Sequence, residues 1–287
     1  MGLGAGAALG PPLLGLLERR MDTRKQGRVL ILAGSDSGGG AGVQADIKTV
    51  TALGGYAATA ITAITVQNTL GVFGVLRLEP ELIKAQALAV LDDIGADAFK
   101  TGMLGGRKAV EAVAEVLASA PGVPAVIDPV MISKGGHALL SDKALSAVMS
   151  LLVPRADLLT PNAPEAEALT GIEIRDLDGQ RRAGEALLSL GAKAVLLKGG
   201  HLEGERVVDL LISAAGETLL EGPRLDTRHT HGTGCTLASA CATGLAQRLT
   251  LEAAVARAWA YTAEAIRRAP GFGQGHGPLD HGWPLRP

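Results

Sequence analysis

Short apolar runs alternate with segments of helical period along most of this chain. Residues 28–33 read RVLILA and end at a glycine, which is typical of a buried parallel strand. Val43, Ile47 and Val50 then recur at helical spacing and predict a helix that ends near Gly54. The alternation continues, with strands predicted at 57–66, 74–78, 98–101, 125–128, 158–160 and 194–197, a hairpin at 207–212 and 218–220, and helices at 80–94, 106–118, 141–152, 176–190, 232–245 and 251–267.

This order of elements predicts an α/β fold in which helices cover both faces of a mostly parallel central sheet. No linker or shift in composition divides the chain after residue 27, so residues 28–287 are expected to form one domain. Ligands of such sheets bind at the carboxyl ends of the strands. Each polar cluster considered below directly follows a predicted strand.

Residues 1–27 differ from the rest of the chain. They are apolar and rich in glycine, but no basic residue precedes the apolar stretch, and Pro11 and Pro12 interrupt it. This is a poor signal peptide and too short for a membrane span. We expect a disordered tail, or an over-extended start with Met21 as the true initiator.

Composition excludes some classes of function. A net charge of −2 gives no reason to expect nucleic acid or an acidic membrane as partner, and 2% aromatic residues leave few platforms for stacking bases. The two cysteines, Cys235 and Cys241, lie six residues apart in a predicted helix and point to different faces. With no zinc-finger spacing in the chain, a reducing, cytoplasmic location fits best.

The first polar cluster is the segment 34–46, GSDSGGGAGVQAD. A glycine-rich turn before a helix can present backbone N–H groups to an anion. It is not a P-loop because it has no lysine, and a dinucleotide fingerprint fails because no acidic residue follows at the required distance. A plain flexible turn is the alternative, with Asp46 complementing the dipole of the helix.

Three further clusters carry charged side chains. Asp128 ends an apolar strand, where a buried carboxylate needs a partner such as a substrate hydroxyl or Mg²⁺; residues 133–137 after it form a possible lid. Asn162 and Glu165 match a helix-capping box, but Glu165 could also lie near a phosphate-bound magnesium through water. Lys198 follows an apolar strand and precedes two glycines, which suits a phosphate contact or a solvated turn.

The sharpest cluster is THGTGC at residues 230–235, which opens a predicted helix. The backbone N–H groups of Gly232, Thr233, Gly234 and Cys235 would project from the helix N-terminus as an anion hole for a phosphoryl group. In the first turn, the dipole is expected to lower the pKa of the Cys235 thiol. The alternative is a glycine-capped helix with a small core cysteine, and Cys241 is assigned to that alternative.

Together, these clusters resemble the hydroxymethylpyrimidine/phosphomethylpyrimidine kinases of thiamine biosynthesis, within the ribokinase superfamily. The resemblance covers residues 29–278 and depends on seven segments in order: AGSDSGGGAGVQADIKT, TAITVQNT, KTGMLG, DPVMISKGG, TPNAPEAEALTG, LLKGGH and THGTGCTLASA. It implies a three-layer α/β/α kinase, usually a homodimer, that uses ATP and Mg²⁺. Its substrates would be 4-amino-5-hydroxymethyl-2-methylpyrimidine and then the monophosphate.

The resemblance also implies roles for individual residues. Asp46 and Gln67 would contact the pyrimidine, with Met103 and Val130 as apolar walls. The amide of Gln67 offers both a donor and an acceptor to an aminopyrimidine edge. The ATP and magnesium side would be formed by Asn162, Glu165 and Lys198, with Asp128 near the metal, and the anion hole by Gly232, Thr233, Gly234 and Cys235.

Cys235 departs from the wider superfamily, in which sugar kinases and many pyridoxal kinases have aspartate as the base at this position. Phosphoryl transfer has a loose transition state, and the nucleophile of the second step is already anionic, so a strong base is not essential. We therefore hypothesise that Cys235 assists the first phosphorylation more than the second. A second departure is that the first strand passes directly to a helix, leaving no room for the β-lid of sugar kinases.

Three alternatives stay open from the sequence. A pyridoxine or pyridoxal kinase would have the same fold, although Gln67 together with Cys235 argues against it. A non-catalytic nucleotide-binding module would not need the anion hole, Lys198 and Asp128. A hydrolase with Cys235 as its nucleophile lacks a clearly paired base, since His231 has no assignable acidic partner.

Overall fold

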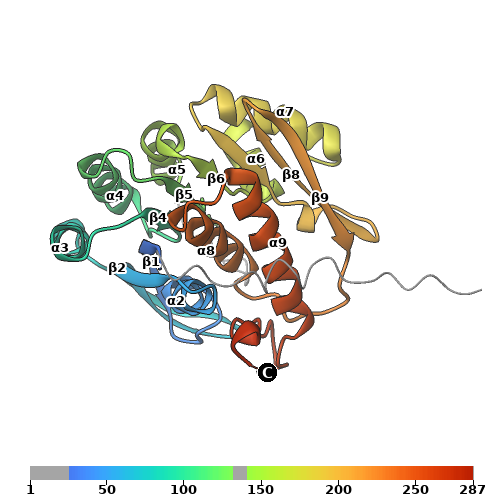
Figure 1. Cartoon of the computed structure of the whole chain (residues 1–287), viewed down its shortest axis with the longest axis horizontal. Coiled ribbons are helices and arrows are strands. Elements are labelled where there is room, and N and C mark those ends of the chain that lie inside the picture. The colour runs from blue at the N-terminus through green and yellow to red at the C-terminus, as the bar shows by residue number, and fades with distance from the viewer. Residues whose placement is uncertain (1–25, 132–140, 287) are drawn as a thin grey trace, which may run out of the picture.

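The computed structural model describes residues 26–131 and 141–286. Within them, one sheet of nine strands has the order β3-β2-β1-β4-β5-β6-β7-β8-β9 (Figure 1). The pairings from β2 through β1, β4, β5 and β6 to β7 are parallel. Antiparallel pairings bring β3, β8 and β9 onto the two edges. The predicted mostly parallel α/β fold is confirmed.

The elements follow the predicted order closely. The strands are β1 (Arg28–Asp36), β2 (Tyr56–Asn68), β3 (Gly71–Arg77), β4 (Ala98–Thr101), β5 (Ala125–Ile127), β6 (Leu158–Leu159), β7 (Ala194–Leu197), β8 (Arg206–Ser213) and β9 (Gly216–Pro223). The α-helices are α2 (Gly42–Ala52), α3 (Pro80–Asp93), α4 (Arg107–Ser119), α5 (Asp142–Ala147), α6 (Ala163–Thr170), α7 (Leu177–Ser189), α8 (Thr233–Ala246) and α9 (Leu251–Arg267). Short helical turns lie at η1 (Val148–Leu152), η2 (Val153–Arg155), η3 (Gly199–His201) and η4 (Trp283–Leu285).

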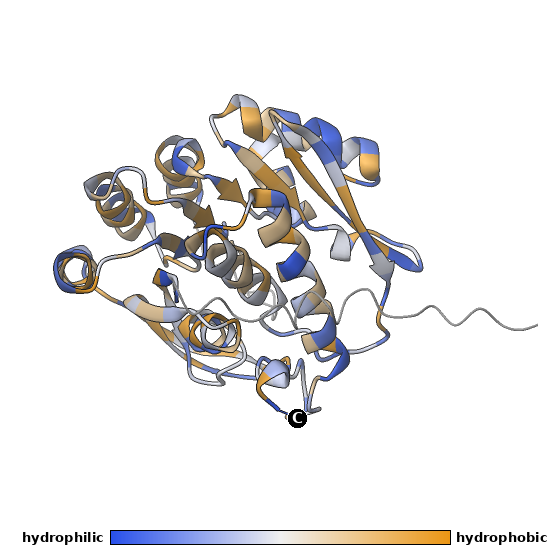
Figure 2. Ribbon diagram, viewed as in Figure 1, coloured by the Kyte–Doolittle hydropathy of each residue, from blue (hydrophilic) through white to orange (hydrophobic). Residues whose placement is uncertain are grey.

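Alternate side chains of the strands supply two separate cores. In β1, Leu30 and Leu32 belong to the core that α3, α4, α6 and α7 cover, whereas Val29 and Ile31 belong to the core that α2, α8 and α9 cover. Successive strand residues point to opposite faces, so a continuously apolar strand needs helices on both sides. Figure 2 shows the resulting distribution, with apolar central strands and polar residues on the outer faces of the helices.

Several local boundaries differ from the predicted ones. β1 runs three residues beyond the predicted end and carries Gly34, Ser35 and Asp36 into the sheet, because Ser35 and Asp36 still pair with β2. Ser141 occupies the N-cap position of α5, but its side chain makes no capping hydrogen bond, so the predicted Ser141 cap is wrong.

No β-lid separates β1 from α2, since only residues 37–41 lie between them, as predicted. The predicted tail lies outside the described residues except for its last two positions, and the possible lid at 133–137 lies wholly outside them. Among the described helices, none combines the length and apolar character that a membrane span requires.

A fully buried ion pair connects three elements below the carboxyl edge of the sheet. Lys100 Nζ of β4 lies 2.8 Å from both carboxylate oxygens of Asp46 in α2. Ser239 of α8 donates to the same carboxylate at 2.7 Å. Lys100 and Asp46 are both 0% exposed, so each charge depends on the other for compensation.

Replacing Lys100 alone should therefore be strongly destabilising. We expect Lys100→Met to lower the free energy of unfolding by about 3–5 kcal/mol, because it leaves the Asp46 carboxylate buried and unpaired. The matched double variant Asp46→Asn/Lys100→Met should recover part of this loss. Urea unfolding followed by circular dichroism measures both; a Lys100→Met protein within about 1 kcal/mol of the wild type would contradict the expectation.

Candidate active site

The carboxyl ends of the parallel strands bring the predicted polar clusters together, as expected for this architecture. Asp36 ends β1, Asp128 follows β5, Asn162 follows β6 and Lys198 follows β7. The N-terminus of α8 lies at the same edge, because a Cβ built on Gly234 would be 3.2 Å from Lys198 Nζ and 3.6 Å from Asp128 Oδ2. Residues distant in sequence therefore share one site.

Gly40 and Gly232 allow the loop between β1 and α2 to contact the loop before α8. Gly232 is the N-cap of α8, with a left-handed backbone at φ 86°, which favours glycine. A Cβ on Gly232 would overlap the carbonyl oxygen of Gly40, and one on Gly40 would overlap the ring of His231. The two glycine-rich motifs are thus in backbone contact, and larger residues at either position would separate them.

The helix start itself can accept an anion. The N–H groups of Gly234 and Cys235 lie in the first turn of α8, where no intrahelical acceptor exists, and neither donates to a described residue. Thr233 donates back to the carbonyl of Thr230 at 3.3 Å. The amides of Gly234 and Cys235 are therefore available to a ligand, and the positive end of the helix dipole is directed at the same point.

Lys198 lies beside these amides within a cluster of buried charges. Its Nζ is 3.0 Å from Asp128 Oδ1 and 3.8 Å from Glu165 Oε2. Burial raises the pKa of Glu165 to about 7 although Lys198 opposes the shift. A cation near a helix N-terminus is unfavourable by itself, so the lysine and the free amides together define a site for a polyanion.

Asn162 and Glu165 form the predicted capping box at the start of α6. Asn162 accepts from the Glu165 amide at 2.9 Å, and Glu165 accepts from the Asn162 amide at 2.8 Å. The same exchange fixes the Glu165 carboxylate next to Lys198. The cap and a place in the charged cluster are thus compatible.

The residues could support a divalent cation only together with a ligand. Among the described residues, no group of three or more His, Cys, Asp or Glu side chains is placed to hold a metal ion alone. Thr160 and Lys198 both donate to Oδ1 of Asp128, which leaves Oδ2 as the oxygen for a further partner. One or two carboxylates plus phosphate oxygens are the usual ligands of Mg²⁺, so this donor set fits.

The thiol of Cys235 behaves differently from the sequence-based prediction. Cys235 is half-buried, and burial raises its pKa to about 11; Asp46 and Asp128 add to the shift, while Lys100 opposes it. The expected lowering by the helix dipole is therefore wrong, because desolvation and two carboxylates outweigh it. Cys241 is fully buried, as expected for a core cysteine.

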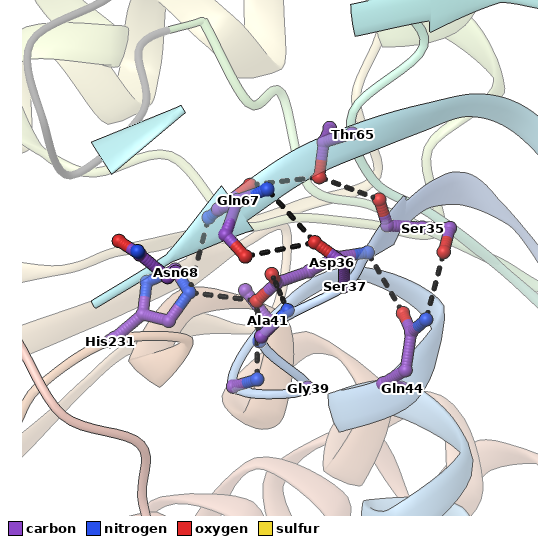
Figure 3. Close-up of polar contacts among 12 residues, drawn as sticks. Ser35, Asp36, Ser37, Gly39, Ala41, Gln44, Thr65, Gln67, Asn68 and His231 are labelled. Carbon is purple, nitrogen blue, oxygen red and sulfur yellow. Dashed lines mark hydrogen bonds and ion pairs between the residues drawn. The ribbon is translucent and has the colours of Figure 1, made fainter. Parts of the chain in front are cut away.

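The other half of the site surrounds Gln67, at the end of β2. Its side chain lies 3.2 Å from Nε2 of His231, the residue before Gly232 (Figure 3). Met103 lies at the same edge, with its terminal methyl against Gly34 and its carbonyl accepting from the Gly34 amide at 2.9 Å. Val130 is half-buried two residues after Asp128. Gln67 and the anion hole are thus neighbours.

The predicted substrate contact by Asp46 is wrong. Its carboxylate is fully buried and engaged by Lys100 and Ser239, so it cannot reach a ligand. Asp36 is the acidic residue of this motif that lies in the site. Its carboxylate accepts from the amides of Gly38 and Ala41, each at 2.8 Å.

Sequence reasoning missed Asp36, His231 and Lys100. The Asp-Ser-Gly-Gly-Gly run after a strand could have pointed to Asp36, because short acidic side chains bind the amides of such turns. A lysine inside the apolar segment AFK was the available signal for Lys100. Nothing local in the sequence indicated that Asp36 and His231 meet.

Solved structures match this arrangement over most of the chain. The pyridoxal kinase of Staphylococcus aureus, in complex with AMP-PCP and pyridoxal, is 33% identical with a TM-score of 0.83 and covers 89% of this chain and 93% of its own. A phosphomethylpyrimidine kinase from Clostridium difficile 630 is 44% identical with a TM-score of 0.75 over 83% and 99%. The fold is therefore the ribokinase-like fold of ATP-dependent kinases.

The family within this class is also defined. The family model for phosphomethylpyrimidine kinase matches residues 36–280. A hydroxymethylpyrimidine/phosphomethylpyrimidine kinase from Streptomyces coelicolor is 51% identical over 257 residues, which are 90% of this chain and 95% of that protein. The chain belongs to the phosphomethylpyrimidine kinase family, as the sequence motifs indicated.

The state of the Cys235 thiol can be tested directly. Because its pKa is about 11, alkylation by iodoacetamide should accelerate roughly tenfold for each pH unit between 7 and 10, since only the thiolate reacts. Mass spectrometry of the peptide that contains Cys235 measures the rate. Cys235→Ser is the control and should not be alkylated, because the remaining cysteine, Cys241, is fully buried. A rate that levels off near pH 8 would show a thiol with a much lower pKa.

Proposed function

We propose that this protein phosphorylates 4-amino-5-hydroxymethyl-2-methylpyrimidine with ATP and then phosphorylates the monophosphate to the diphosphate, in thiamine biosynthesis. The observation that carries the proposal is the adjacency of Gln67 to the N-terminus of α8 through His231. A ring bound at Gln67 would place its hydroxymethyl group near the free amides of Gly234 and Cys235. Family membership supports the same reaction.

Each half of the site has a distinct task in this proposal. Gln67, with Met103 and Val130 as apolar walls, binds the ring. The amides of Gly234 and Cys235 stabilise the charge that develops on the transferred phosphoryl group. Lys198 contacts the phosphates, and Glu165 and Asn162 lie on the same side.

Mg²⁺ would be held by Asp128 with the nucleotide phosphates, and by Glu165 through water. Its contribution when bound is to neutralise negative charge between the phosphates of ATP. Lys198 keeps the Asp128 carboxylate oriented by donating to Oδ1. The remaining oxygen is thereby left for the nucleotide side of the site.

We further propose a cytoplasmic homodimer that acts on small molecules and does not bind nucleic acid. Exposed apolar side chains on β2, β3 and the turn between them support self-association: Val66, Leu70, Phe73 and Leu76 are each 60–67% exposed. Large exposed apolar surfaces of this kind are typical of sites that bind a partner. The edge of β3 that does not face β2 adds unpaired backbone groups to this surface.

A pyridoxine or pyridoxal kinase is the second candidate, favoured by the likeness to the S. aureus pyridoxal kinase. A coupled ADP-release assay on the free pyrimidine, its monophosphate and pyridoxine distinguishes the two. The proposal predicts turnover of both pyrimidines with a higher kcat/KM than for pyridoxine. ADP release with pyridoxine alone would overturn it.

Removing the Cys235 thiol should affect the two steps unequally. General bases typically contribute 10²–10⁴-fold, but a thiol with a pKa of about 11 is protonated at neutral pH. We expect Cys235→Ala to slow the first phosphorylation by only about tenfold and the second hardly at all, because the phosphate nucleophile is already anionic. Single-turnover rates for each substrate measure this; equal slowing of both steps would contradict it, and Cys235→Ser controls for volume.

A further inference from the structure

The ring of His231 is held between two side chains of the site. Its Nε2 lies 2.8 Å from Asp36 Oδ2 and 3.2 Å from the side-chain amide of Gln67 (Figure 3). These three residues come from the end of β1, the end of β2 and the loop before α8. The His231 backbone amide donates to the carbonyl of Gly277 at 3.1 Å, which fixes the backbone that carries the ring.

The charge on Asp36 determines where the imidazole carries its proton. Asp36 accepts hydrogen bonds from the amides of Gly38, Gly40 and Ala41. Burial alone would raise the pKa of Asp36, but the bonds from His231 and the backbone amides lower it overall. An ionised carboxylate 2.8 Å from Nε2 requires a proton on that nitrogen, which is therefore a donor.

A donor at Nε2 fixes the orientation of the Gln67 amide. The amide nitrogen of Gln67 is the atom placed 3.2 Å from Nε2, but two donors cannot face each other. We therefore assign the amide oxygen to this end, where it shares the single Nε2 proton with Asp36. The contact of the Gln67 amide with Thr65, on the side away from His231, indicates the same orientation independently. Thr65 Oγ1, 3.1 Å from that end, has one proton and directs it to the carbonyl of Ser35 at 2.9 Å, so it can only accept from Gln67.

This arrangement limits what Gln67 can offer to a ligand. One N–H is used on Thr65, and one oxygen lone pair faces the Nε2 proton that Asp36 also accepts. A single N–H and a single lone pair of Gln67 are left. A ring edge with an amino group next to a ring nitrogen is complementary to that remaining pair. With the amide free to turn over, both polarities would be accepted and this selectivity would be lost.

We propose that His231, held by Asp36, is a positioning residue that locks the Gln67 amide in one orientation and thereby selects aminopyrimidine rings. This inference rests on the proposed function, since it presumes that Gln67 binds the ring. His231 touches neither the transferred phosphoryl group nor the nucleotide in this scheme. Its effect on catalysis is transmitted through Gln67.

A double-mutant cycle on the full-length chain tests the inference. The wild type, His231→Leu, Gln67→Ala and Gln67→Ala/His231→Leu are compared for kcat/KM with the free pyrimidine at saturating ATP. We expect His231→Leu to lower kcat/KM about tenfold, mainly through KM, and to change the KM for ATP less than twofold. In the Gln67→Ala background, the same substitution should change kcat/KM less than twofold.

His231→Gln is the conservative control, because its amide nitrogen can replace Nε2 as the donor between Asp36 and Gln67 and should retain most of the activity. Should His231→Leu not fold, His231→Asn replaces it in the cycle, since the shorter side chain does not extend to both partners. Equal losses from His231→Leu in both backgrounds, or no loss in either, would overturn the inference alone. A wild type that does not turn over the pyrimidine would overturn the proposed function and this inference with it.

Discussion

The backbone contact between Gly40 and Gly232 is the constraint on which the site depends. It brings the loop after β1 against the loop before α8, two segments that are separated by most of the chain. Through it, Asp36 meets His231, and His231 places Gln67 beside the free amides of α8. Without glycine at these positions, the part of the site around Gln67 and the part around Lys198 and the start of α8 would move apart.

The fold was largely predictable because its strands are buried on both faces and its helices have a regular period, two signals that are local in sequence. The clustering of Asp128 and Lys198 was predictable for a similar reason, since each directly follows a parallel strand. Asp46 could not be interpreted correctly, because its burial depends on Lys100 and Ser239, which lie 54 and 193 residues away. The pKa of Cys235 likewise depends on charges from other elements, which no local dipole argument includes.

The proposed roles of the site residues would also account for the likeness to pyridoxal kinases. The charged cluster around Lys198 and the amide-bearing start of α8 are suited to any phosphoryl donor and carry no information about the acceptor ring. In the proposed function, selectivity would then lie in the few side chains around Gln67. The high structural likeness to a pyridoxal kinase at 33% identity agrees with this division.

His231 and Gly232 are consecutive residues, yet in the proposed site one would act in ring recognition and the other in phosphate binding. A change in backbone conformation that moves the imidazole would also shift the peptide plane that starts α8, whereas a change of the side chain alone need not. Evolution toward a new acceptor on this scaffold is therefore expected to proceed through the end of β2, where side chains can change without moving the anion hole. The loop before α8 would stay fixed while the chemistry of the accepted vitamin precursor diverges.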